Sequence, residues 1–68
     1  MKTKPTTGLL IRQARFEAEL TQEQLAELAD VDQSKLSKYE RGEQLPSIAT
    51  MRRIAVALNQ KHWWELYA

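Results

Sequence analysis

Two short stretches with helical patterning, Gln22–Ala29 and residues 33–41, are separated by only three residues, and this spacing constrains the fold more than any other feature. A joint this short forces the two helices to cross steeply. The crossing requires a small side chain in the first helix, which Ala26 provides, and an apolar side chain in the turn, which Val31 provides. The sequence therefore predicts a crossed pair of helices at the centre of the chain.

Capping signals and apolar residues at three- and four-residue spacings predict further helices on both sides of this pair. Thr21 and Gln24 form a capping box before the second helix, and Asp32 and Ser47 are suited to cap the third and fourth. Gly42 can take the left-handed conformation that ends a helix. The expected helices span about residues 8–20, 22–29, 33–41, 48–58 and 61–67.

No segment alternates with a period of two between turn signals, so we expect an all-α protein. Its 68 residues allow one domain, residues 1–68, built as a compact bundle of about five short helices. Residues 1–7 are expected to form a flexible arm, and residues 60–68 a short C-terminal helix.

Composition excludes several classes of function. The chain has no cysteine and one histidine, so we expect no disulfide, no metal site and no cofactor. His62 has no serine, cysteine or metal-ligand partner at useful spacing, and two glycines cannot build a phosphate loop, so we expect neither an enzyme nor a small-molecule binder. No apolar run could span a membrane and no signal peptide is evident, which predicts a cytoplasmic protein.

The net charge of +1 is not by itself a sign of nucleic-acid binding, but the charges are unevenly distributed. Lys35, Lys38 and Arg41 lie close together and follow a segment rich in acidic residues. A nearly neutral total can therefore hide one basic face. Glutamine, serine and lysine can read base edges in the major groove. The third expected helix carries all three residue types on the face opposite Leu36 and Tyr39.

The segments LTQEQLA (residues 20–26) and VDQSKLSKYERG (residues 31–42) resemble the Cro/C1-type, or XRE-like, helix-turn-helix family. That family includes lambdoid phage repressors, restriction-modification controller proteins and some antitoxins. The resemblance runs from about Gly8 to Leu66 and implies a lambda-repressor-like DNA-binding domain. It also implies a bacterial or phage-encoded transcriptional regulator, a repressor or controller, that binds double-stranded DNA sequence-specifically.

In this family the third helix enters the major groove, and its first residues meet the bases. The resemblance makes Gln33, Ser34, Lys35 and Lys38 the candidates for base contacts. The candidates for phosphate contacts are Gln22, Ser37 and Arg41. Gln22 opens the second helix, where free amides and the positive end of the helix dipole favour an anion.

The resemblance further implies an internal ion pair between Arg15 and Glu40, at positions where an arginine of the first helix meets a glutamate of the third. Two positions depart from the family pattern. Asp30 stands where glycine is common, and aspartate tolerates a left-handed backbone better than most residues. Glu43 and Gln44 replace a connector that is often basic in relatives, which predicts a weaker non-specific grip on DNA.

One recognition helix reads few base pairs, so the resemblance also implies a homodimer on a pseudo-palindromic operator. Aromatic residues are enriched at the centres of interfaces. The dimer candidates are Trp63, Leu66 and Tyr67, whereas Trp64 resembles the family's packing position. The alternative, that both tryptophans cap the core, stays open.

A second function also stays open at this stage. The same fold can act as a protein-binding adaptor or antitoxin, with the C-terminal segment as the working surface. An adaptor would bind DNA weakly and without sequence preference. The sequence decides neither the operator nor whether the protein is a phage repressor, a controller or an antitoxin.

Overall fold

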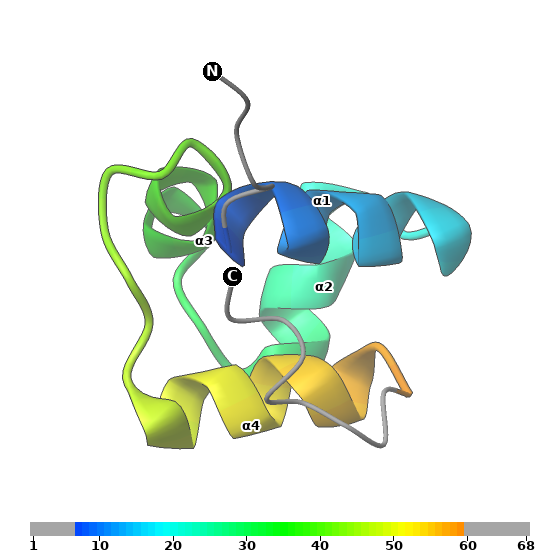
Figure 1. The fold of residues 1–68 in the computed structure, drawn as a ribbon. Helices are drawn as coiled ribbons and strands as arrows, with labels where there is room; N and C mark the ends of the chain where they lie inside the picture. The colour runs from blue at the N-terminus through cyan, green and yellow to red at the C-terminus, as the bar shows by residue number, and fades with distance from the viewer. Residues whose placement is uncertain (1–6, 60–68) are drawn as a thin grey trace.

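The computed structural model describes residues 7–59, which form four helices and no strand. The helices are α1 (Thr7–Glu17), α2 (Gln22–Ala29), α3 (Gln33–Glu40) and α4 (Ile48–Ala57). α2 lies at the centre and packs against α3 and α4, while α1 packs against α3 (Figure 1). None of the four has the length and apolar character needed to cross a membrane. The predicted all-α fold is confirmed over this range, and the expected fifth helix and most of the expected arm lie outside it.

All four helices contribute side chains to a single hydrophobic core. Its fully buried members are Ile11, Leu25, Leu36, Met51 and Ile54. α1 approaches the end of α3 closely at Gly8, where an added Cβ would lie 2.2 Å from the Tyr39 carbonyl oxygen. Thr7, which was expected in the arm, is the buried first residue of α1. The arm prediction was wrong for this residue because the seating of α1 on α3 extends to the first turn of the helix.

The predicted caps are present at two of three helix starts. Thr21 Oγ1 accepts a hydrogen bond from the Gln24 amide at 3.0 Å, and Gln24 Oε1 accepts from the Thr21 amide at 2.8 Å. Ser47 caps α4 by accepting from the Thr50 amide at 3.2 Å. Asp32 occupies the N-cap position of α3, as predicted, but its side chain makes no capping hydrogen bond. Asp32 is exposed, and water can serve the first amides of α3 instead.

The turn between α2 and α3 has the predicted form. Asp30 adopts the left-handed conformation, with φ 57° and ψ 51°. The Val31 amide then donates to the Ala26 carbonyl at 2.9 Å, and Val31 packs half-buried against the core. This turn sets the steep crossing of α2 and α3.

α1 ends three residues earlier than expected, at Glu17 instead of Leu20. Glu19 is left-handed, with φ 59°, and the Leu20 amide donates to the Arg15 carbonyl at 3.1 Å. The chain thus turns back and packs Leu20 against the core. Glutamate is not a residue typical of left-handed positions, so the sequence did not predict that α1 would end here.

Some apolar side chains of the chain lie outside the core. Leu28 and Ile48 are each 62 % exposed, and Ala18 is exposed as well. α2 turns Leu25, Ala26 and Ala29 to the core, and Leu28 lies at the edge of this buried side. Ile48 is the first residue of α4 and precedes Met51, the first α4 side chain that reaches the core.

Candidate nucleic-acid interface

α3 has two sides with different surroundings. Its inner side carries Leu36, Tyr39 and Glu40, which are buried against the rest of the fold. Its outer face consists of Gln33, Ser34, Lys35, Ser37 and Lys38, of which Ser37 is half-buried and the others are exposed. The structure thus brings the base-contact candidates together on one accessible helix face.

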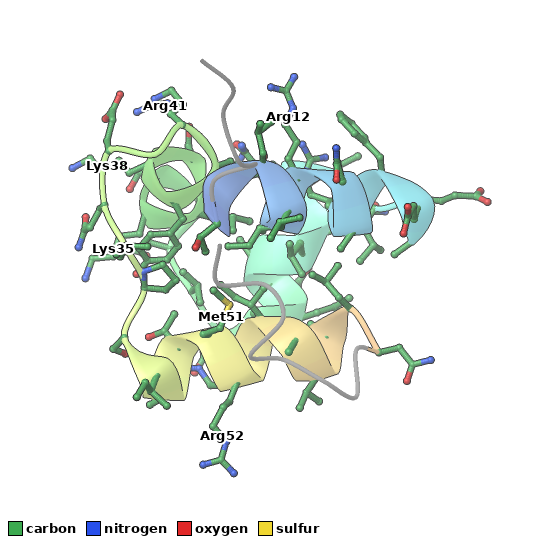
Figure 2. All side chains as sticks on the ribbon, in the orientation of Figure 1. Arg12, Lys35, Lys38, Arg41, Met51 and Arg52 are labelled. Atoms are coloured by element: carbon green, nitrogen blue, oxygen red, sulfur yellow. The ribbon has the colours of Figure 1, made fainter. Side chains whose placement is uncertain are left out.

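The basic side chains on α3 and at its C-terminal end lie apart from two other arginines of the protein. Lys35, Lys38 and Arg41 project on the same side of the molecule, whereas Arg12 and Arg52 point away from it (Figure 2). The Arg12 guanidinium instead lies over the Phe16 ring, 5.5 Å from its centre. Positive charge is therefore gathered along α3 and its C-terminal end.

Arg53 is exposed but also makes a structural contact. Its Nε donates a hydrogen bond to the Ala29 carbonyl at 3.0 Å, which ties α4 to the end of α2. The two residues are 24 positions apart, so the sequence carried no local sign of this bond.

The inner side of α3 contains the Arg15–Glu40 ion pair. Arg15 Nε lies 2.8 Å from Glu40 Oε2, and Nη2 lies 3.1 Å from Oε1. Arg15 Nη1 also donates to the Leu20 carbonyl at 3.0 Å. The two side chains are 10 % and 4 % exposed. This two-bond contact joins α1 to the buried side of α3.

Gln22, a candidate for phosphate contact, joins the same network. Its Nε2 donates to Glu40 Oε1 at 3.2 Å, so its amide is turned toward the inner side of α3. This bond could not be predicted from neighbouring residues, because the crossing of α2 and α3 brings Gln22 and Glu40 together from 18 positions apart. Gln22 remains the first residue of α2, where backbone amides can still face an anion.

Arg41 and Ser37, the other phosphate-contact candidates, lie beside each other at the end of α3. Arg41 Nη1 donates to Ser37 Oγ. Arg41 also pairs with Glu43, with Nε 2.8 Å from Oε2 and Nη2 3.1 Å from Oε1. Hydrogen bonding from Arg41 lowers the pKa of the Glu43 carboxyl, and the same contact raises the pKa of Arg41. Sequence reasoning missed this pair, although the short spacing across Gly42 was visible.

The geometry of two crossed helices can be compared with known proteins. The helix-turn-helix family model matches residues 11–62. The chain belongs to the helix-turn-helix family. This membership confirms the resemblance seen in the sequence.

Two relatives of this helix-turn-helix protein show the extent of the similarity. An uncharacterized HTH-type transcriptional regulator from Methanothermobacter thermautotrophicus is 40 % identical over 58 residues, which cover 85 % of this chain and 84 % of that protein. The crystal structure of the restriction-modification controller protein C.AhdI from Aeromonas hydrophila matches with a TM-score of 0.84 and 33 % identity. That match covers 90 % of this chain and 91 % of the C.AhdI chain.

Within the helix-turn-helix motif, α2 is the first helix and α3 the second. The second helix of such a motif is the one that lies in the major groove. The outer face of α3 is therefore the accessible side of the second helix of the motif. The predicted dimer residues Trp63, Leu66 and Tyr67 lie outside the described residues.

Proposed function

We propose that this DNA-binding transcriptional regulator recognises a specific double-stranded sequence by placing the outer face of α3 in the major groove. The observation that carries the proposal is the division of α3 into a buried side and an exposed side. Leu36, Tyr39 and Glu40 fix the helix to the fold, which leaves an accessible row of polar and cationic side chains.

Each group on this face suits a distinct kind of contact. Glutamine can donate to and accept from an adenine edge at once, lysine can donate to guanine O6 and N7, and serine can pair with several bases. We assign base contacts to Gln33, Ser34, Lys35 and Lys38. The sequence specificity of the protein would come from these four residues.

Phosphate contacts would set the position of α3 on the duplex. We assign them to Gln22, Ser37 and Arg41. Gln22 would act through the start of α2, because its side-chain amide is held by Glu40. Ser37 and Arg41 flank the outer face and are joined by a hydrogen bond, so one phosphate could engage both.

We also propose that the protein binds as a homodimer in the cytoplasm. α3 has eight residues and is about 12 Å long, so one copy meets a short stretch of groove. Two copies on a two-fold symmetric operator would place their half-sites roughly 34–36 Å apart. We assign the contact between copies to Trp63, Leu66 and Tyr67. Sedimentation of the wild type and Trp63→Ala with a symmetric duplex tests this, and a wild type that stays monomeric on one half-site would contradict it.

The alternative function is that of an adaptor that binds another protein, and one observation favours it. Leu28 and Val56 are 62 % and 78 % exposed and line a groove of about 270 Å³ between the end of α2 and α4. Exposed apolar patches often mark contact sites. An adaptor that uses this groove would bind DNA weakly and without sequence preference.

Selection of binding sites from random duplex DNA separates the two functions. We expect an enriched two-fold symmetric sequence that the protein binds at least about 10³-fold more tightly than a scrambled duplex at the same salt concentration. Equal affinity for the selected and scrambled duplexes would contradict the proposed function and favour the adaptor.

A further inference from the structure

The Glu43 carboxylate occupies the part of Arg41 that is best suited to bind a phosphate. A guanidinium presents paired N–H groups that match a carboxylate or a phosphate with two parallel hydrogen bonds. In the free protein Nε and Nη2 of Arg41 are bonded to the two oxygens of Glu43, and Nη1 is bonded to Ser37. All three nitrogens of the guanidinium are thus engaged before DNA arrives.

The backbone at the end of α3 holds Glu43 in this place. Gly42 is left-handed, with φ 79°, and turns the chain back on the helix. The Glu43 amide then donates to the Lys38 carbonyl at 2.9 Å. Glu43 is therefore folded against the last turn of α3, where its carboxylate faces Arg41 and lies near the Lys38 charge.

Stability of the fold does not account for this arrangement. The Arg41 and Glu43 side chains are 54 % and 53 % exposed, and exposed ion pairs contribute little to stability. A carboxylate near the C-terminal end of a helix is also disfavoured by the helix dipole. The accessible pair lies instead beside the face that we assign to DNA.

We propose that Glu43 is an internal competitor of DNA phosphate for Arg41 and so limits the sequence-independent grip of the protein on the DNA backbone. This inference rests on the proposed function, since it needs α3 to face the duplex. A phosphate that binds Arg41 must displace the carboxylate, and the freed carboxylate attracts a cation. When Arg41 binds the phosphate, one cation leaves the DNA, but another cation binds the freed Glu43 carboxylate. The Arg41–phosphate contact therefore adds little to the salt dependence of binding.

A double-mutant cycle on a random-sequence duplex tests the competition. The variants are Glu43→Gln, Arg41→Ala and the combination, with Kd measured by fluorescence anisotropy over a range of salt concentrations. We expect Glu43→Gln to bind roughly 2- to 5-fold more tightly than the wild type. The plot of log K against log salt should become steeper by about 0.9, the value for one additional phosphate contact. In the Arg41→Ala background, Glu43→Gln should have no such effect.

A matched control separates competition from a general change of charge. Glu17→Gln also removes one carboxylate, from the end of α1 that lies away from α3 (Figure 1). It should leave both the affinity and the salt slope as in the wild type. Glu43→Ala, which also removes the hydrogen-bond acceptor, should behave like Glu43→Gln.

Two results would overturn the inference while leaving the proposed function intact. One is an equal gain from Glu43→Gln with and without Arg41, and the other is an equal gain from Glu17→Gln. A wild type that does not prefer its selected duplex would contradict the proposed function itself, and with it this inference. The two failures are thus distinguishable by one comparison of duplexes.

Discussion

Two arginine–glutamate pairs, one on the buried side of α3 and one at its C-terminal end, have almost the same geometry and different surroundings. Arg15–Glu40 and Arg41–Glu43 both have one N–O distance of 2.8 Å and one of 3.1 Å. The side chains of the first pair are 10 % and 4 % exposed, and those of the second 54 % and 53 %. Burial, and not the contact itself, therefore decides whether such a pair stabilises the fold or stays available to a ligand.

The largest effect should come from breaking the buried pair. Arg15→Ala or Glu40→Ala should each lower the free energy of unfolding by about 3–5 kcal/mol, because each leaves one charge buried without its partner. Chemical denaturation of both variants and of the double variant measures this. The double variant should lose less than the sum of the two.

A milder variant keeps this test usable if the alanine variants do not fold. Arg15→Lys retains the charge but cannot form two parallel hydrogen bonds, so its stability should lie between those of the wild type and Arg15→Ala. Strictly additive losses in the double variant would show that the two side chains do not stabilise each other.

The next largest loss of stability should come from disturbing the close packing of α1 against α3 at Gly8. Gly8→Ala should lower the free energy of unfolding by about 1–3 kcal/mol, since the new Cβ would lie 2.2 Å from a backbone oxygen of Tyr39 and the helices must shift. Thermal melts measure this, with Gln13→Ala on the exposed face of α1 as the control. A Gly8→Ala variant as stable as the control would contradict the close approach of α1 and α3.

Alanine substitutions on the outer face of α3 should weaken DNA binding without lowering the stability of the fold. Lys38→Ala and Gln33→Ala should each weaken binding to the selected duplex by about 1–3 kcal/mol, the value of a good base contact. Both should melt like the wild type, because both side chains are exposed. Arg52→Ala, an exposed cation on α4, is the control for charge. If its loss of affinity equals that of Lys38→Ala, the assignment of base contacts is wrong.

The smallest effect on stability should come from the exposed pair. Arg41→Ala and Glu43→Ala should leave the melting temperature close to that of the wild type. The pKa of Glu43 is lowered in the folded state, chiefly by its hydrogen bond from Arg41. Any stabilisation is therefore complete above the ordinary pKa of glutamate and is lost as the pH falls through the lowered value. NMR titration should show the Glu43 pKa rising in Arg41→Ala; an equal pKa in both proteins would mean that the pair does not form in solution.

Features encoded by neighbouring residues could be predicted from the sequence. The capping box of Thr21 and Gln24, the left-handed Asp30 and Gly42 and the packing of Val31 all depend on a few consecutive positions. The membership of the family, and with it the exposed position of the outer face of α3, followed from the order of these signals.

Features that depend on distant contacts or on solvent could not be predicted in the same way. The bond from Gln22 to Glu40 arises from the crossing of two helices, and the exposure of Leu28 depends on how far α4 covers α2. Asp32 has the right residue type for a cap, but a small free-energy difference separates the state in which its carboxylate caps α3 from the state in which it is hydrated. The Arg41–Glu43 pair forms across the predicted left-handed Gly42, but it also depends on how two exposed side chains orient in solvent, which their spacing alone does not specify.

Mapping the contact with DNA residue by residue tests most directly whether the exposed side of α3 reads the sequence. The selected duplex is added to labelled protein, and the shifts of the backbone amide NMR signals are followed. We predict the largest shifts along the outer face of α3 and at the start of α2, with little change at Leu28 and Val56. Shifts centred on Leu28 and Val56 that leave residues 33–38 unchanged would contradict the claim that the exposed side of α3 reads the DNA.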